Sequence, residues 1–145
     1  MNAQSSHPPR TVRHPPPDRP LLIYDGECNF CGRWIARWEQ VTGKRVGYCE
    51  FQQLGERFPE IPRAAFEQAV QLIELDGRVL SGADAVIRLF DFAPQERWLP
   101  RLMRGMPGFM PIARVAYRFI AAHRTFFSRI TPWNGDPHNS TQPPP

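Results

Sequence analysis

Apolar residues in the first part of the chain follow two different periods. Residues 21–25 (LLIYD) form a short apolar run between Pro20 and Gly26, which is typical of a buried strand. Beyond this run, apolar side chains recur at steps of four and three residues, which predicts one stripe of a helix. The stripe consists of Phe30, Trp34, Trp38 and Val41. Gly43 follows it as a suitable C-terminal stop.

A second strand and a hairpin are predicted next. Residues 45–51 (RVGYCEF) have the composition of a strand. Residues 69–82 (AVQLIELDGRVLSG) place Asp76-Gly77 between two apolar runs, and this dipeptide is a strong signal for a tight turn. The two runs are therefore expected to form neighbouring antiparallel strands.

Three helical segments are predicted after the hairpin. They cover residues 83–92, 96–104 and 111–130. Ser81 stands three residues before Asp84, a spacing that resembles a capping box and would place Ser81 at the start of the first helix. The apolar face of the last helix includes His123, which favours a core histidine over a ligand.

The order of these elements predicts the fold class. Two strands joined by a helix are expected to be parallel, through a right-handed crossover, and the hairpin then adds two more strands. This is the order found in thioredoxin-like domains. We therefore expect an α/β fold of the thioredoxin-like type, with a four-stranded mixed sheet flanked by helices and an extra C-terminal helical segment.

Both ends of the chain are rich in proline and polar residues and have little apolar area to bury. We expect a disordered Pro-rich tail over residues 1–19, one thioredoxin-like domain over residues 20–131 and a disordered tail over residues 132–145. Three cysteines, no apolar leader and no apolar stretch of membrane-spanning length favour a cytoplasmic protein.

The net charge of +4 is unevenly distributed along the chain. Residues 97–130 contain seven arginines and no acidic residue. They form either a solvated helix face or, through the basic C-terminal helix, a contact with a membrane surface or an acidic partner. No motif of interleaved basic and aromatic residues accompanies them, so nucleic acid is not expected as a partner.

Cys28 and Cys31 form a Cys-x-x-Cys pair directly after the first predicted strand. Backbone N–H groups at a helix N-terminus stabilise an anion, so a thiolate at Cys28 would be favoured there. Two intervening residues make about one helical turn, which lets the two sulfurs approach each other. Cys28 is then the attacking thiol, and Cys31, one turn further in, is the resolving thiol.

Two other interpretations of the pair stay open, a metal site and an inert pair of packed thiols. A metal needs further ligands, and the chain has no second closely spaced pair. Cys49 lies in a predicted strand, where a small core residue is the more ordinary role. We therefore expect no metal. No nucleotide, flavin or haem motif is present, so we expect no cofactor and an external thiol reductant.

The stretch YDGECNFC, residues 24–31, resembles the signature of the DCC family of thiol-disulfide oxidoreductases, Asp-x-x-Cys-x-x-Cys. SGADAV (81–86) and YRFIAAHR (117–124) are also similar to that family. The resemblance, over roughly residues 20–130, implies a thioredoxin-like protein-disulfide reductase whose substrate is a disulfide-containing protein or a small thiol.

The resemblance also implies a role for Asp25 beside the two catalytic thiols. Its carboxylate would either accept the Cys31 proton or bond to backbone N–H groups of the loop. The hairpin order places Ser81, Gly82 and Ala83 next to the cysteines as substrate-adjacent residues, although Ser81 has the alternative role of a helix cap. The chain departs from thioredoxins at one point. In thioredoxins a cis-proline directly precedes the third strand, whereas Pro62 of this chain lies several residues ahead of the third predicted strand.

Overall fold

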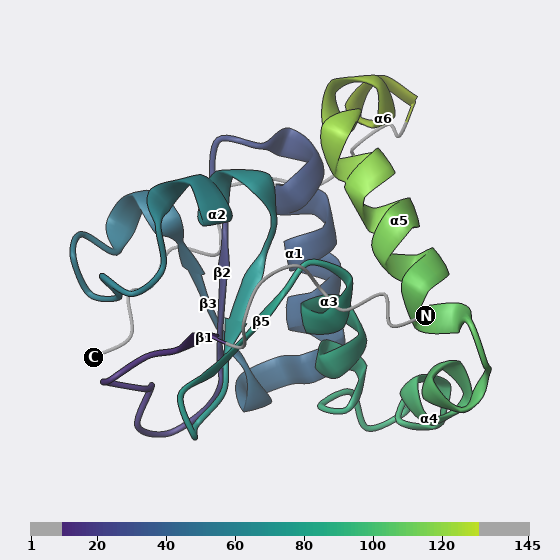
Figure 1. Cartoon of the computed structure of the whole chain (residues 1–145), viewed down its shortest axis with the longest axis horizontal. Helices are drawn as coiled ribbons and strands as arrows, with labels where there is room; N and C mark the ends of the chain where they lie inside the picture. Colours follow the sequence, from purple (N-terminus) through teal and green to yellow (C-terminus); the bar gives the residue numbers. More distant parts are fainter. Residues whose placement is uncertain (1–9, 131–145) are drawn as a thin grey trace.

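Five strands form one mixed sheet in the order β1-β5-β4-β2-β3 (Figure 1). The strands are β1 (Arg10–Thr11), β2 (Leu21–Tyr24), β3 (Gly47–Glu50), β4 (Gln71–Ile73) and β5 (Arg78–Ser81). β2 pairs in parallel with β3, and all other pairs are antiparallel. The computed structural model describes residues 10–130, so the expected tail over 132–145 and residues 1–9 lie outside it.

Helices cover both faces of the sheet (Figure 1). They are α1 (Asn29–Thr42), α2 (Arg63–Gln68), α3 (Ala83–Phe90), α4 (Trp98–Gly105), α5 (Phe109–Ala122) and α6 (Arg124–Ile130), with short 3-10 turns η1 (Gly43–Arg45) and η2 (Phe51–Gln53). The expected thioredoxin-like α/β fold with extra C-terminal helices is confirmed.

β2 lies between β4 and β3 in the sheet, and all four of its side chains are buried. Leu22 and Tyr24 face a core shared with α1 and α3, whereas Leu21 and Ile23 face a second core shared with α2. Alternating side chains of a strand point to opposite faces of the sheet, so this uninterrupted apolar run serves both layers. The end of β2 is thereby fixed, and the loop that carries the cysteines begins there.

The predicted stripe of α1 is wrong in its details. The side chains that α1 buries are Ile35, Trp38 and Thr42, whereas Trp34 is 47% exposed. The repeat of large aromatic residues indicated a stripe along one edge of the helix. The buried face is instead centred on Ile35, which packs with the core residues of β2 and β4.

The hairpin predicted from Asp76-Gly77 is confirmed by the antiparallel pairing of β4 with β5. Gly77 has a φ of +87°, and its N–H donates to the Glu74 carbonyl at 3.0 Å. A Cβ atom at Gly77 would lie 2.8 Å from the Val12 carbonyl oxygen. Glycine is therefore required both by the turn and by the close approach of the N-terminal segment.

That N-terminal segment corrects the expected four-stranded sheet and, for residues 10–19 alone, the disordered tail expected over residues 1–19. Arg10–Thr11 forms the fifth strand, paired with Val79 and Arg78 of β5. Val12 is buried in the second core, and its N–H donates to the Gly77 carbonyl at 2.9 Å. The proline-rich composition concealed a strand of two residues, because such a short pairing leaves no periodic pattern.

The last predicted helix is also different, because it consists of two helices that meet at His123. His123 ends α5 and is exposed, with its Nδ1 2.9 Å from the Phe119 carbonyl oxygen, so the expected core role is wrong. Ile112 and Val115 of the predicted apolar face are 69% and 66% exposed. Within residues 10–130, no helix is both long and apolar enough to cross a membrane.

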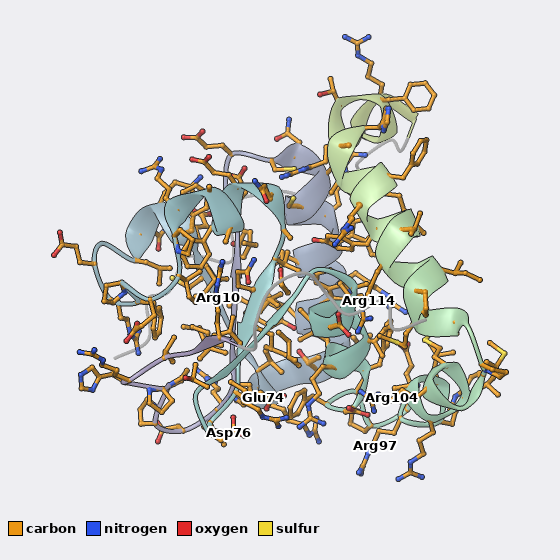
Figure 2. The ribbon with its side chains drawn as sticks, in the orientation of Figure 1. Arg10, Glu74, Asp76, Arg97, Arg104 and Arg114 are labelled. Carbon is orange, nitrogen blue, oxygen red and sulfur yellow. The ribbon has the colours of Figure 1, made fainter. Side chains whose placement is uncertain are left out.

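Ion pairs attach α4 and α5 to α3 (Figure 2). Arg114 of α5 donates two hydrogen bonds of 3.0 Å to the Asp84 carboxylate at the start of α3. Arg104 of α4 likewise donates two hydrogen bonds to Asp91, at 2.8 and 3.2 Å. Paired N–H groups fix orientation as well as distance. The C-terminal helices are therefore held in one position against the sheet domain.

We predict that Val12→Ala lowers the free energy of unfolding by about 1–3 kcal/mol, because it removes buried methyl groups from the second core. Thr11→Ala, one residue earlier and exposed, should change it by less than about 0.5 kcal/mol. Urea denaturation followed by circular dichroism measures both. Equal, small effects would show that the N-terminal segment is not part of the domain.

Candidate active site

The loop between β2 and α1 is held by the side chain of Asp25. Its Oδ1 accepts hydrogen bonds from the Glu27 N–H at 3.1 Å and from Gln52 Nε2 at 2.7 Å. The Gln52 Oε1 in turn accepts the Gly26 N–H at 3.1 Å. The Asp25 carbonyl accepts the Cys28 N–H at 3.3 Å. These bonds fix the turn that delivers Cys28 to the start of α1.

Cys28 is the N-cap residue of α1. Its backbone is extended, with φ −90° and ψ 104°, and its Sγ accepts a hydrogen bond from the Cys31 N–H at 3.3 Å. A sulfur therefore occupies the capping position that a serine or aspartate oxygen normally takes, and it satisfies a backbone donor of the first turn. Both thiols are half-buried, and both are free.

The pKa values of the two thiols are shifted in opposite directions. A hydrogen bond from the Cys31 thiol, together with the Cys31 N–H and the Arg124 guanidinium, lowers the pKa of Cys28 to about 6, against the opposing effect of burial. The hydrogen bond to Cys28, burial and the negative charge on Cys28 raise the pKa of Cys31 well above its usual range. At neutral pH, Cys28 is therefore the thiolate and Cys31 its hydrogen-bond donor.

Arg124 of α6 brings a positive charge over this pair. Its Nη1 lies 3.9 Å from Cys31 Sγ and 3.9 Å from Asp25 Oδ2. Its Nη2 donates to the carbonyls of Glu67 and Gln68, and its Nε donates to the Ala121 carbonyl at 2.9 Å. The guanidinium is thus fixed by backbone acceptors and directs a charge toward the sulfurs and the loop aspartate.

Tyr117 of α5 is the second residue that the C-terminal helices contribute. Its hydroxyl accepts the Val70 N–H at 3.1 Å, just ahead of β4, and burial raises its pKa. Its ring lies against Gly82, where a Cβ atom would be 3.1 Å from the Tyr117 Cδ1. Gly82 also has a φ of +58°, so no other residue fits this junction without strain.

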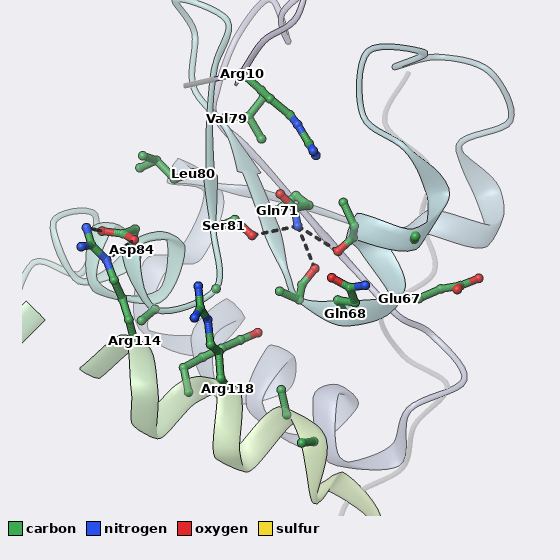
Figure 3. A pocket seen from close by; sticks show the side chains of 18 of the residues that line it. Arg10, Glu67, Gln68, Gln71, Val79, Leu80, Ser81, Asp84, Arg114 and Arg118 are labelled. Carbon is green, nitrogen blue, oxygen red and sulfur yellow. Dashed lines mark hydrogen bonds and ion pairs between the residues drawn. The ribbon is translucent and has the colours of Figure 1, made fainter. Parts of the chain in front are cut away.

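The structure brings the two thiols and Asp25 together, as expected, and gives Asp25 the bonds of the loop-holding role. Ser81, Gly82 and Ala83 line a cavity of about 830 Å³ together with Tyr117 and Arg124, whereas neither cysteine lines it (Figure 3). Their expected place next to a substrate stays a prediction. Ser81 does not cap α3, whose N-cap is Gly82. Ser81 Oγ instead accepts a hydrogen bond from Gln71 Nε2 at 3.0 Å.

Two functional residues, Arg124 and Tyr117, were not predicted from the sequence. Both belong to the stretch YRFIAAHR, which was noted only for its family likeness and its arginines. That likeness was the available signal, because contacts spanning 93 residues, as between Arg124 and Cys31, leave no local pattern.

Cys49 lies apart from this site in the way expected of a small core residue. It is half-buried, packs against the second core, and has its Sγ 3.4 Å from the Glu50 carbonyl oxygen as donor. Burial raises its pKa. In residues 10–130, no three or more His, Cys, Asp or Glu side chains are grouped so that they could hold a metal ion.

A thioredoxin-like sheet, a Cys-x-x-Cys pair capping α1 and unequal thiol pKa values define a thiol-disulfide exchange site. The model of the DCC1-like thiol-disulfide oxidoreductase family matches residues 22–130, and the chain belongs to this family. The resemblance drawn from YDGECNFC is thereby confirmed. Searches of curated proteins and of solved structures gave no significant match.

We predict that the alkylation rate of Cys28 rises with pH through a midpoint near 6, because the thiolate is the reacting form. Arg124→Gln should move this midpoint upward, while the bonds from Cys31 keep it below that of an ordinary thiol. Arg129→Gln, an exposed arginine on the same helix, is the matched control. Iodoacetamide labelling with peptide mass spectrometry measures the rate, and an unmoved midpoint in Arg124→Gln would contradict the assigned role.

Proposed function

We propose that the chain works as a protein-disulfide reductase, with Cys28 as nucleophile and Cys31 as resolving thiol. The observation that supports this most is the pairing of a Cys28 thiolate with a protonated, more buried Cys31. The thiolate attacks one sulfur of the substrate disulfide, that disulfide breaks, and a mixed disulfide with Cys28 forms. The substrate's other sulfur leaves as a thiolate.

Cys31 completes the exchange. Its sulfur attacks Cys28 Sγ, the Cys28–Cys31 disulfide forms, and the second substrate sulfur leaves. The Cys31 proton passes to a departing thiolate, so two electrons leave the enzyme and the substrate gains them with that proton. An external thiol reductant restores the pair. Asp25 and Arg124 act as positioning residues, since the Asp25 carboxylate is engaged by loop donors and by Arg124.

A second proposal concerns the face of α5 that points away from the sheet domain. Ile112, Val115 and Phe119 follow helical spacing and are 69%, 66% and 59% exposed. Arg97, the N-cap residue of α4, and Arg101 of α4 are exposed as well, and residues 97–130 contain no acidic residue. An apolar stripe flanked by arginines suits an anionic lipid surface. We propose that this stripe, the α5 stripe, attaches the protein to such a surface.

We predict that Cys31→Ser accumulates a covalent mixed disulfide with an oxidised protein substrate, because the resolving sulfur is missing, whereas Cys28→Ser accumulates none. Cys49→Ser is the matched control and should resolve its substrate like the unaltered chain. Non-reducing electrophoresis with native insulin, which keeps its disulfides, as substrate measures the adduct. Equal trapping by the Cys28 and Cys31 variants would contradict the assigned order of attack.

We also predict that the chain sediments with vesicles containing phosphatidylserine and less with vesicles of phosphatidylcholine alone. The double variant Val115→Glu/Phe119→Glu should lose most of this binding, because it puts negative charge on the α5 stripe. The matched control is Thr11→Glu/Gln40→Glu, which adds the same charge at exposed sites outside the α5 stripe and should keep the binding. The proposal fails if the two double variants bind alike, or if the stripe proves to hold a second copy of the chain in solution.

A further inference from the structure

A cavity of about 830 Å³ lies beside the cysteine site, between α5, the end of β5 and the segment that includes α2 (Figure 3). This volume falls within the roughly 300–1,000 Å³ range of small-molecule sites. Small side chains make the space, because six alanines line it: Ala64, Ala65, Ala69, Ala83, Ala121 and Ala122. The thiol chemistry described above does not itself need this space.

The charges around the cavity do not cancel. Four arginines and two acids line it, and the acids are engaged. Asp84 accepts hydrogen bonds from Nε and Nη2 of Arg114. Glu67 pairs with Arg63, which lies outside the lining, at 3.1 Å.

The positive charges left over belong to Arg10 and Arg118. Arg10 comes from β1 and Arg118 from α5, so they stand on different walls, and Figure 3 shows both side chains directed toward the cavity. Across residues 10–130, neither guanidinium has a hydrogen bond or an ion pair. Two free guanidinium groups facing one hollow are suited to carboxylates, which they bind through paired N–H donors.

The floor of the cavity adds a neutral polar group. Gln71 is 2% exposed, and its Nε2 donates to Ser81 Oγ at 3.0 Å and to the carbonyls of Ala65 and Ala69 at 3.0 and 3.1 Å. Because Ser81 Oγ accepts from Gln71, its own hydrogen is left to donate to a ligand. Ser81 is exposed at this point.

Two residues of the cavity lining, Arg124 and Tyr117, also belong to the cysteine site. Arg124 lines the cavity and also places its Nη1 3.9 Å from Cys31 Sγ. Tyr117 lines it as well and is close enough to both cysteines for their charge to raise its pKa, after the larger effect of burial. A molecule anchored between Arg10 and Arg118 could therefore extend past Arg124 toward Cys28.

We propose that this cavity binds low-molecular-mass disulfides that carry carboxylate groups, with Arg10 and Arg118 as their anchors. The inference rests on the thiol-disulfide exchange of the proposed function and adds small disulfides to its protein substrates. The Cys28 thiolate attacks the bound disulfide, one carboxylate-bearing thiolate leaves, and Cys31 then displaces the second. The cysteine pair is oxidised, and the small disulfide is reduced to one thiol, which takes the Cys31 proton, and one thiolate, which takes a proton from water. An external dithiol returns the two electrons.

The test compares two disulfides that differ in charge. Pre-reduced chain is mixed with glutathione disulfide, which carries carboxylates, or with bis(hydroxyethyl) disulfide, which is neutral. Alkylation at timed intervals gives the second-order rate constant for oxidation of Cys28 and Cys31 by each. We expect the ratio of the charged to the neutral rate constant to fall roughly tenfold in Arg10→Gln/Arg118→Gln. Arg13→Gln, an exposed arginine outside the lining, should leave the ratio unchanged.

A binding measurement separates this inference from the exchange chemistry. Cys28→Ser/Cys31→Ser cannot react, and calorimetry should still detect glutathione disulfide binding that the two arginine substitutions weaken. Binding without reduction of either small disulfide or of insulin by the unaltered chain would overturn the proposed function and leave the cavity assignment standing. Reduction of both disulfides with an unchanged ratio, or binding only of acidic peptides, would overturn the cavity assignment alone.

Discussion

A thiolate at Cys28 depends on donors that the chain supplies from two distant segments. The thiol and N–H of Cys31 come from the first turn of α1, and the Arg124 guanidinium comes from α6. The spacing of the pair determines the local donors, whereas the guanidinium needs the whole domain to be folded. The pKa values of the two thiols therefore differ, so that Cys28 is a thiolate and Cys31 keeps its proton. This difference supports the proposed order, in which Cys28 attacks and Cys31 resolves, and it requires no further base.

The C-terminal helices are therefore part of the active site. Tyr117 rests on Gly82 and accepts the Val70 N–H, while Arg114 holds Asp84 one turn earlier on α5. The stretches SGADAV and YRFIAAHR are both similar to the family but lie far apart in the sequence, and they are in contact in the structure. This contact holds α5 in place, and the end of α5 determines where α6 begins. Small residues after β5 are needed for this packing.

Local patterns predicted what depends on neighbouring residues. The buried run of β2, the Asp76-Gly77 hairpin and the placement of Cys28 at a helix start follow from such patterns. The misses have a common cause, which is contact between residues far apart in the chain. The pairing of β1 is accompanied by the close approach of Val12 to Gly77. Arg124 reaches the sulfurs because α6 is in contact with α1, the helix that carries the cysteines. Neither contact could be inferred from spacing.

The segment ahead of β4 shows how the site differs from that of thioredoxins, which have a proline there. Its backbone groups are engaged by side chains of the same chain: the Glu67 and Gln68 carbonyls by Arg124, the Ala69 carbonyl by Gln71 and the Val70 N–H by Tyr117. Less of this backbone is left to pair with an extended substrate. Recognition would then come from groups around it, and the guanidinium groups of Arg10 and Arg118 and the hydroxyl hydrogen of Ser81 are available for it. The proposed selectivity for charged disulfides agrees with the contacts that hold Arg124 over the sulfurs.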